Sequence, residues 1–282
     1  FRNASNHLVP AMPPTLPRAA RLPINRCNLP ADILGSLTYQ RHPVALKLDG
    51  VEELHAALFA HLANLADATE RAADFMAHMD AAFSLAHPEE AGYSAARPLG
   101  RPKANYLMVL RGWAFDADGR EGAVLKGWVE SRFGLLPRHH GGPIRDFSGA
   151  TYRHYLEQRS GGLYNTNSLE AQLDLLYAYC QFELARRWPE ETHLTLYRGV
   201  NRMGDYEVLE EAGRGHRIVL LNSLNSFTLE RERACEFGDT ILEARIPLAK
   251  VFFFHRLLPG KLRGEEEFGV IGGVCEVGYS TL

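Results

Sequence analysis

The sequence predicts an α+β protein with a mainly helical N-terminal part and a β-rich C-terminal part. Apolar residues recur at three- and four-residue steps before residue 190, whereas short runs of β-branched and aromatic residues dominate after it. Of the 282 residues, 46% are hydrophobic and 23% are charged, so the chain can bury a substantial core. We expect an extended proline-rich arm over residues 1–48, a mainly helical region over 49–190 and a β-rich core over 191–282, which together can form one continuous domain.

Composition and charge exclude several classes of protein. The formal net charge is −3, so no basic excess indicates a nucleic-acid partner. No stretch has the apolar length of a membrane span, and the N-terminal segment lacks the apolar core of a signal peptide, so we expect a cytoplasmic protein. The four cysteines are widely spaced without a CxxC pair, which favours reduced thiols over a zinc site.

The helical region begins with one long amphipathic stretch. Asp49 and Glu52 have the spacing of a capping box, and leucines then recur at helical steps until Leu65. The pattern resumes at Ala72, Phe75, Met79 and Phe83 and stops near Pro88. We therefore expect this stretch to bury one face in the core.

The middle of the chain combines an irregular segment with two further helices. Residues 88–148 are rich in glycine, and we expect irregular structure anchored by aromatic side chains at Tyr106, Trp113 and Trp128. A helix is predicted over Thr151–Gln158, ending at Gly161-Gly162. Another is predicted over Leu169–Arg187, capped by Asn167 and ended by Trp188-Pro189.

Five β-rich runs follow, each bounded by glycine, proline or asparagine. A short helix over Leu229–Phe237 interrupts them, with Thr228 as its N-cap and Gly238 just beyond its end. The predicted strands are His193–Val200, Arg217–Leu221, Thr240–Ile246, Val251–His255 and Phe268–Tyr279.

Common nucleotide and protease signatures are absent. The sequence has no GxGxxG after a strand, no GxxxxGK[ST], no HExxH and no GxSxG, which argues against Rossmann and P-loop enzymes. The adjacent His139 and His140 favour a solvated loop over a metal site, because neighbouring histidines rarely serve one metal unaided. We therefore predict no metal in the catalytic site.

Two segments of the β-rich part carry candidate binding residues. Arg198 stands on a strand otherwise suited to burial and can grip a diphosphate with paired hydrogen bonds, and Gly199 lets a ligand or backbone come close. Ser226 and Thr228 are expected between a strand and the helix that ends at Phe237. The plainer interpretations are an edge-strand salt bridge for Arg198 and a helix cap for the hydroxyls.

The third segment is Glu265-Glu266-Glu267, which leads into an apolar strand. In extended chain Glu265 and Glu267 point to one side and Glu266 to the other. Two carboxylates on one face repel each other and gain from a cation between them. A solvated acidic turn is the alternative, and a shift by one residue would make Glu266 the functional acid. We prefer Glu267 because Phe268 then starts the strand.

The order of these three segments resembles the Arg–Ser–Glu group of mono-ADP-ribosyltransferases. This resemblance implies an ADP-ribosyltransferase-like β-sandwich core, with NAD⁺ as the co-substrate. Glu267 would stabilise an oxocarbenium-like ribose, Ser226 would orient Glu267, and Glu265 would orient the acceptor arginine and take its proton. The implied NAD⁺-binding residues are Arg198, Gly199, Ser226, Thr228 and Phe237.

Over its whole length the chain resembles the dinitrogenase reductase ADP-ribosyltransferases of nitrogen-fixing bacteria. The segments that carry this resemblance are residues 22–30, residues 35–40 and Leu196-Tyr197-Arg198-Gly199-Val200-Asn201. It implies transfer to one arginine of the nitrogenase iron protein, in response to ammonium or energy limitation, under control by a PII signalling protein. The open alternatives are an NAD⁺ glycohydrolase, a non-catalytic NAD⁺-sensing or partner-binding module, and a helical scaffold.

Overall fold

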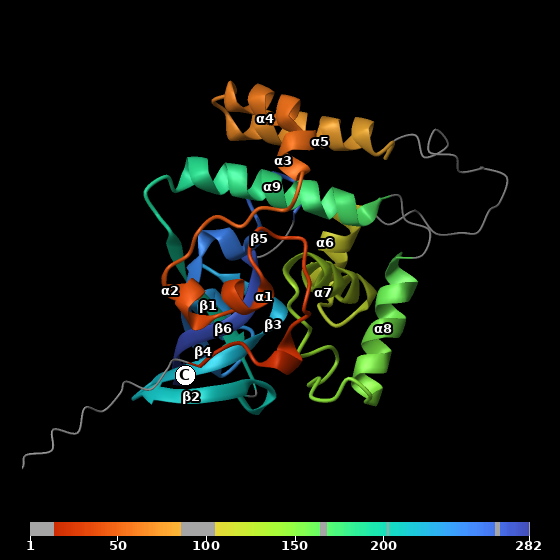
Figure 1. Ribbon diagram of the computed structural model, residues 1–282. Coiled ribbons are helices and arrows are strands. Elements are labelled where there is room, and N and C mark those ends of the chain that lie inside the picture. Colours follow the sequence, from red (N-terminus) through yellow and green to blue (C-terminus); the bar gives the residue numbers. More distant parts are fainter. Residues whose placement is uncertain (1–13, 86–104, 164–167, 202, 263–265, 282) are drawn as a thin grey trace, which may run out of the picture.

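The computed structural model describes residues 14–85, 105–163, 168–201, 203–262 and 266–281, which form a six-stranded antiparallel sheet flanked by helices (Figure 1). The predicted α+β class is therefore confirmed. Helices occupy the first part of the sequence and strands the last. Among the described residues, no helix is long and apolar enough to cross a membrane.

The described part of the N-terminal segment is less extended than we expected. It contains η1 (Arg18–Ala20), α1 (Ala31–Leu34) and α2 (Leu37–Arg41). Apolar side chains on these short helices, such as Leu34 and Leu37, are buried in the main core, and α2 packs on β6 (Glu267–Thr281). Prolines alone suggested an exposed arm, but burial of the leucines between them favours folding back onto the sheet.

The long helix expected after Asp49 is broken into three: α3 (Val51–Leu54), α4 (Ala56–Ala63) and α5 (Ala68–Ala82). The Asp49 capping box was wrong, because Gly50 in a left-handed conformation precedes α3 and no side chain caps it. Asp67 instead caps α5, accepting a hydrogen bond from the Glu70 amide. The expected buried face of α5 is confirmed at Ala72, Phe75 and Met79.

Much of the segment expected to be irregular is helical, and this prediction was wrong for Tyr106–Phe115 and Arg120–Phe133. Asn105 caps α6 (Tyr106–Phe115), and α7 (Arg120–Phe133) follows after a short turn. The glycines that suggested loops serve close packing instead. A Cβ at Gly112 would clash with the Glu121 side chain, and one at Gly127 would clash with Arg159. The predicted aromatic anchors Tyr106, Trp113 and Trp128 are all buried.

The next two helices were largely predicted. Helix α8 (Ala150–Leu163) runs through Gly161-Gly162 rather than ending there, because Gly162 lies against Val124 and Arg120 of α7, where a larger residue would clash. Helix α9 (Leu169–Arg187) has its predicted bounds and ends at Trp188. The predicted cap Asn167 lies outside the described residues.

The sheet has the order β2-β3-β1-β4-β6-β5, with β3 also paired to β6. Four strands match the prediction closely: β1 (His193–Val200), β4 (Thr240–Pro247), β5 (Val251–Phe254) and β6. β2 (Glu207–Gly213) was missed because its sequence is polar and its residues are mostly exposed. The short helices between strands are η2 (Met203–Asp205), α10 (Arg231–Cys235) and η3 (Leu248–Lys250).

Strand β3 (His216–Thr228) is longer than predicted and includes the segment expected to open a helix. Ser226 and Thr228 are therefore strand residues, and Thr228 is not the N-cap of α10. The strand continues through Asn225 and Ser226 because both residues pair with β6, and Thr228 pairs with Tyr197 of β1.

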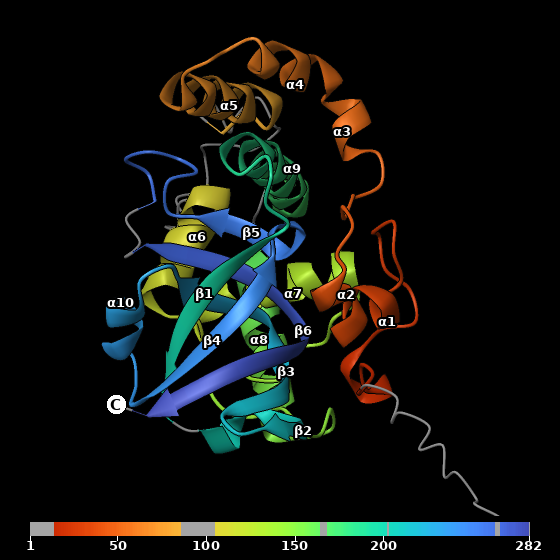
Figure 2. The same ribbon diagram turned by 90° about the vertical axis from the view of Figure 1, so that its left-hand side faces the viewer.

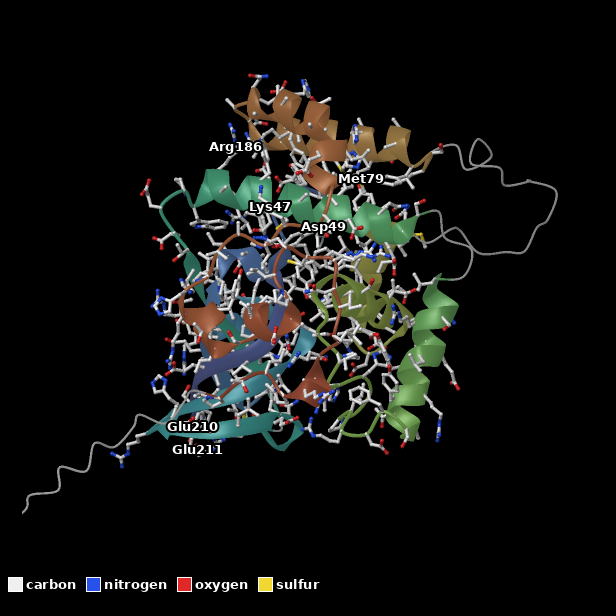
Figure 3. All side chains as sticks on the ribbon, in the orientation of Figure 1. Lys47, Asp49, Met79, Arg186, Glu210 and Glu211 are labelled. Carbon is white, nitrogen blue, oxygen red and sulfur yellow. The ribbon has the colours of Figure 1, made fainter. Side chains whose placement is uncertain are left out.

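Helix α9 and helices α3 to α5 form two layers over one end of the sheet (Figure 2). Helix α9 packs on β5, and α3 to α5 cover the outer side of α9 (Figure 2). Met79 of α5 and Arg186 of α9 lie in the seam between these layers, whereas Glu210 and Glu211 of β2 lie at the opposite end of the molecule (Figure 3). Helices α6, α7 and α8 flank the sheet on a different side, where α7 packs on β3.

One buried ion pair ties the outer layer to α9. Arg71 Nε donates to Glu183 Oε1 at 2.5 Å and Nη2 donates to Oε2 at 3.0 Å, while Nη1 donates to the carbonyls of Leu65 and Ala66. The two residues are 4% and 0% exposed. Glu183 also forms a longer contact with Arg187, at 3.4 Å.

We predict that Arg71→Met destabilises the protein by about 3 kcal/mol, because it leaves the Glu183 charge buried with a weaker partner. The measurement is the free energy of unfolding from urea denaturation. The matched control is Lys47→Met, which removes the exposed Lys47–Glu52 pair and should cost about 0–1 kcal/mol. Equal effects of the two substitutions would contradict the prediction.

Candidate active site

Three of the predicted residues are joined by hydrogen bonds in one cleft. The Ser226 hydroxyl donates to Glu267 Oε1, and the Ser226 carbonyl accepts from Arg198 Nη1 at 2.7 Å. Arg198 Nε also donates to the Tyr206 hydroxyl at 2.8 Å. Ser226 therefore holds the arginine with its backbone and the carboxylate with its side chain.

Strand pairing explains why these residues meet. Thr228 of β3 lies opposite Glu267 of β6 and Tyr197 of β1, so the end of β3 lies between the strands that carry Arg198 and Glu267. Ser226 lies opposite Gly269, where a Cβ would clash with the Phe253 ring. Glycine at this position lets β5 and β6 approach each other beside the site.

A fourth residue, Trp113 of α6, completes the contacts to the carboxylate. Its indole Nε1 donates to Glu267 Oε1 at 2.7 Å. Among the described residues, no group donates to the second carboxylate oxygen, Oε2. The sequence indicated Trp113 only as a buried anchor. A buried tryptophan usually finds an acceptor for its N–H, but nothing in the sequence identifies that acceptor as Glu267.

Burial opposes ionisation of the Glu267 carboxyl, and neighbouring hydrogen-bond donors and a cation offset this effect in part. Burial raises the pKa of this carboxyl above its ordinary value, while the hydrogen bonds from Ser226 and Trp113 and the charge of Arg198 lower it. The desolvation effect is the largest, so the net pKa shift is upward. An ionised Glu267 is thus a carboxylate with little solvation of its own, which favours a nearby cation.

The cleft lies between the α6–α7 connection, strands β1 and β3, and the segment after α10. Its volume is about 520 Å³ on the side of Arg138 and about 560 Å³ on the side of Glu267, and the two sides share Trp113, Arg198 and Ser226. Each of these two volumes falls within the range of roughly 300–1,000 Å³ that is usual for small-molecule sites. We call this space the Arg198 cleft.

Basic side chains gather at the end of the Arg198 cleft away from Glu267. Lys126, Arg138 and His139 line it together with Arg198 and one acid, Asp118, which accepts a hydrogen bond from Lys126. Asn222 of β3 fixes the loop that carries two of them, because its Oδ1 accepts from the backbone amides of Arg138 and His139. The Arg138 Nε is buried and has no hydrogen-bond partner among the described residues. This end therefore suits an anionic part of a ligand.

Lys126 enters the cleft from α7 and is 1% exposed. Its Nζ donates to Asp118 Oδ1 at 2.7 Å, lies 3.2 Å from His140 Nδ1 and lies 5.9 Å from the centre of the Trp113 ring. Burial lowers the pKa of Lys126, and the charge of Arg198 lowers it further, while Asp118 raises it. Burial and the charge of Lys126 lower the pKa of His140 to about 4.

The expectation of a solvated loop at His139-His140 was therefore wrong for His140, which is fully buried. The sequence could not show that a buried lysine occupies the same pocket. Among the described residues, no group of three or more histidine, cysteine or acidic side chains could hold a metal ion. All four cysteines are free, and three of them are buried.

The remaining predicted residues lie at the rim of the Arg198 cleft or near it. Gly199 and Thr228 line the cleft beside Phe237, which is 56% exposed. The packing also requires glycine at position 199, because a Cβ there would clash with the Ala234 carbonyl of α10. The Thr228 hydroxyl accepts from the Glu230 amide.

The acidic segment is only partly described. Glu265 lies outside the described residues. Glu266 has a left-handed backbone with φ of 55°, so the extended alternation assumed for this segment does not hold at that residue. Glu267 is the acidic residue of this segment that contacts Ser226 and lines the cleft.

Fold and site together describe an α+β protein with an Arg, Ser and Glu cluster in a nucleotide-sized cleft. The profile of the dinitrogenase reductase ADP-ribosyltransferase family matches residues 24–279. The chain is 40% identical over 262 residues to the NAD(+)–dinitrogen-reductase ADP-D-ribosyltransferase of Rhodospirillum rubrum, covering 92% of this chain and 95% of that protein. The chain therefore belongs to the dinitrogenase reductase ADP-ribosyltransferase family. No solved structure matches it.

The raised pKa of Glu267 predicts a stability gain for Glu267→Gln. The folded state holds the Glu267 proton more tightly than the unfolded chain does, so stability from this residue is present at low pH and is lost as pH rises through the folded pKa. Glutamine keeps an oxygen for Ser226 and Trp113 and carries no charge. We expect Glu267→Gln to melt at a higher temperature than wild type near about pH 7, with the difference disappearing near about pH 4.

Calorimetry at both pH values measures this difference. Glu211→Gln is the control, because Glu211 is an exposed acid of β2 paired with Arg217. A Glu267→Gln protein that is less stable than wild type at neutral pH would show that the ionised form is the stabilising one.

Proposed function

We propose that this protein is a mono-ADP-ribosyltransferase that moves ADP-ribose from NAD⁺ to an arginine of the nitrogenase iron protein. The observation that carries the proposal is the hydrogen-bonded set of Arg198, Ser226 and Glu267 in one cleft. Family membership adds the substrate class, since the relative from Rhodospirillum rubrum is named for transfer of ADP-ribose to dinitrogen reductase.

The Arg198 cleft fits NAD⁺ in size and charge. The NAD⁺ molecule carries a diphosphate between two nucleosides, and the basic end of the cleft offers Lys126, Arg138 and Arg198 to it. The exposed Phe237 ring at the rim offers a surface on which a flat base can stack. Gly199 and Thr228 complete the wall near Glu267.

Glu267 is proposed to stabilise the ribosyl cation. As the bond from ribose to nicotinamide breaks, its electron pair leaves with the nicotinamide and positive charge develops on the ribose. A desolvated carboxylate already held by Ser226 and Trp113 needs little reorganisation to stabilise that charge. Its Oε1 is occupied by these donors, which leaves Oε2 for the substrate.

The acceptor arginine enters protonated and is a poor nucleophile. When one guanidinium nitrogen bonds to the ribose carbon, one proton is released and the substituted guanidinium keeps its positive charge. We propose that Glu265 orients this guanidinium and takes the proton. Glu266 is proposed to have no part in the chemistry.

In the cell we propose that the modification inactivates the iron protein when ammonium appears or energy falls, with a PII signalling protein as activator. The proline-rich segment before residue 48 and the region 88–148 are proposed to contact the target or the regulator. We further propose that the sheet is the β-sandwich core of the ADP-ribosyltransferases and that the enzyme acts in the cytoplasm.

We predict that Glu267→Gln lowers both ADP-ribosyl transfer and NAD⁺ hydrolysis by about 10²–10³-fold, the usual cost of removing one electrostatic stabiliser of a transition state. The assay uses labelled NAD⁺ and purified nitrogenase iron protein, with and without a PII protein and ADP. Label on one arginine of the iron protein is the expected product. Wild-type protein that releases only free ADP-ribose would identify a glycohydrolase, and no NAD⁺ consumption under any condition would leave a binding module.

We predict that Glu265→Gln shifts the products from labelled iron protein towards free ADP-ribose, because water needs no help in orienting a guanidinium. The measured quantity is the ratio of the two products. Glu266→Gln is the matched control and should keep the wild-type ratio. If Glu266→Gln instead lowers both transfer and hydrolysis while Glu265→Gln keeps the wild-type ratio, the acidic segment acts in the register shifted by one residue, with Glu266 as the catalytic acid.

A further inference from the structure

A smaller pocket reaches Glu267 from the side of α6 and β5. Its volume is about 270 Å³, and Glu267 lines it as well as the Arg198 cleft. One carboxylate therefore borders two spaces. The smaller one lies below the range of roughly 300–1,000 Å³ that is usual for drug-sized ligands, so it suits a single long side chain better than a nucleotide.

The walls of this pocket suit the stem and the head of an arginine. Leu110 and Leu262 offer apolar surface to a chain of methylene groups. Phe115 and Phe253 place aromatic rings beside the same space, and a planar guanidinium stacks favourably on such rings. Phe115 is 94% exposed at the end of α6, so the pocket has an apolar rim that a protein substrate can cover.

His255 gives the pocket a hydrogen-bonding side chain whose ring no described residue contacts by a hydrogen bond. Both of its ring nitrogens are buried, and neither has a hydrogen-bond partner among the described residues. Its backbone amide donates to the Glu267 carbonyl at 2.9 Å, which fixes the residue next to the catalytic acid. A buried polar group without a partner is costly, so its persistence calls for a ligand that completes it.

The pocket is bordered by the Glu267 carboxyl and by the Arg111 guanidinium, and charges nearby act on His255. Burial and the charges of Arg256 and Arg187 lower the pKa of His255, while Glu266 raises it. The imidazole is thus neutral near neutral pH and has a nitrogen that accepts a hydrogen bond. Arg111 of α6 is exposed, with its Nε bonded to the Lys261 carbonyl at 3.3 Å, so its charge is solvated at the rim.

We infer that this pocket receives the guanidinium side chain of the acceptor, with His255 accepting a hydrogen bond from one of its N–H groups. The inference rests on the proposed transfer to arginine. A guanidinium has five N–H donors. While one nitrogen approaches the ribose beside Glu267, His255 holds another, so the pocket selects a guanidinium over an ammonium group.

Binding to the complete protein tests the pocket apart from the reaction. The probe is agmatine, a small guanidino compound, followed by nuclear magnetic resonance of ¹⁵N-labelled histidine rings, with the His255 signal assigned from its loss in His255→Gln. We expect agmatine to shift the His255 signal and 1,4-diaminobutane, which has no guanidinium, to leave it in place. An unchanged His255 signal at saturating agmatine would overturn the inference.

Two variants then test the role in transfer. His255→Gln should weaken agmatine binding about tenfold, as expected for one hydrogen bond to a charged group, and should lower the ratio of ADP-ribosylagmatine to free ADP-ribose. Leu262→Trp should lower the same ratio by filling the pocket. The control is His42→Gln, an exposed histidine that lines none of the described pockets. Thermal melting verifies that each variant is folded.

The outcomes separate this inference from the proposed function. Wild-type transfer that both pocket variants leave unchanged would overturn the inference while the function stands. A His255 signal that responds to agmatine without any ADP-ribosylated product, on agmatine or on the iron protein, would overturn the function while the pocket stands as a guanidinium site.

Discussion

The structure depends on how one carboxylate oxygen is held at the start of the last strand. Glu267 Oε1 accepts hydrogen bonds from Ser226, which belongs to the sheet, and from Trp113, which belongs to the helical part. The C-terminal strands supply Arg198, Ser226 and Glu267. The hydrogen bond from Trp113 to Glu267, however, requires α6 to lie against these strands. The described site is therefore complete only when both parts of the chain have folded and packed against each other.

The packing around α6 and α7 serves this requirement. Lys126 enters the cleft fully buried, and Asp118 accepts a hydrogen bond from it at 2.7 Å, which offsets part of the cost of burying the amine. Although burial opposes ionisation of Asp118, hydrogen bonding with His139 and the charge of Lys126 lower its pKa, so the acid stays available as a partner. The loop carrying His139 is in turn bonded to Asn222 of β3. A chain of polar contacts thus runs from α7 to the strand that carries Ser226.

The sequence predicted those elements whose signals are local. The bounds of β1 and α9 follow from alternation, helical periodicity and the Trp188-Pro189 stop, and the structure has them at the predicted residues. Helices α6 and α7 were missed because their glycines suggest loops, whereas Gly112 and Gly127 are needed where side chains of other elements approach. The order of Arg198, Ser226 and Glu267 could be seen in the sequence, but the contacts of Trp113 and His255 depend on tertiary packing that spacing does not reveal.

The position of Glu267 between two spaces suggests how binding and chemistry are related. Its carboxyl is desolvated and has two donors on one oxygen, and no described residue donates to the other oxygen. This arrangement is unfavourable for the ionised acid by itself, and it becomes more favourable as positive charge develops beside it. An interaction that strengthens from ground state to transition state accelerates a reaction, whereas one that is equally strong in both only tightens binding. The cost of keeping Glu267 in this environment is therefore consistent with a role in stabilising a transient cation.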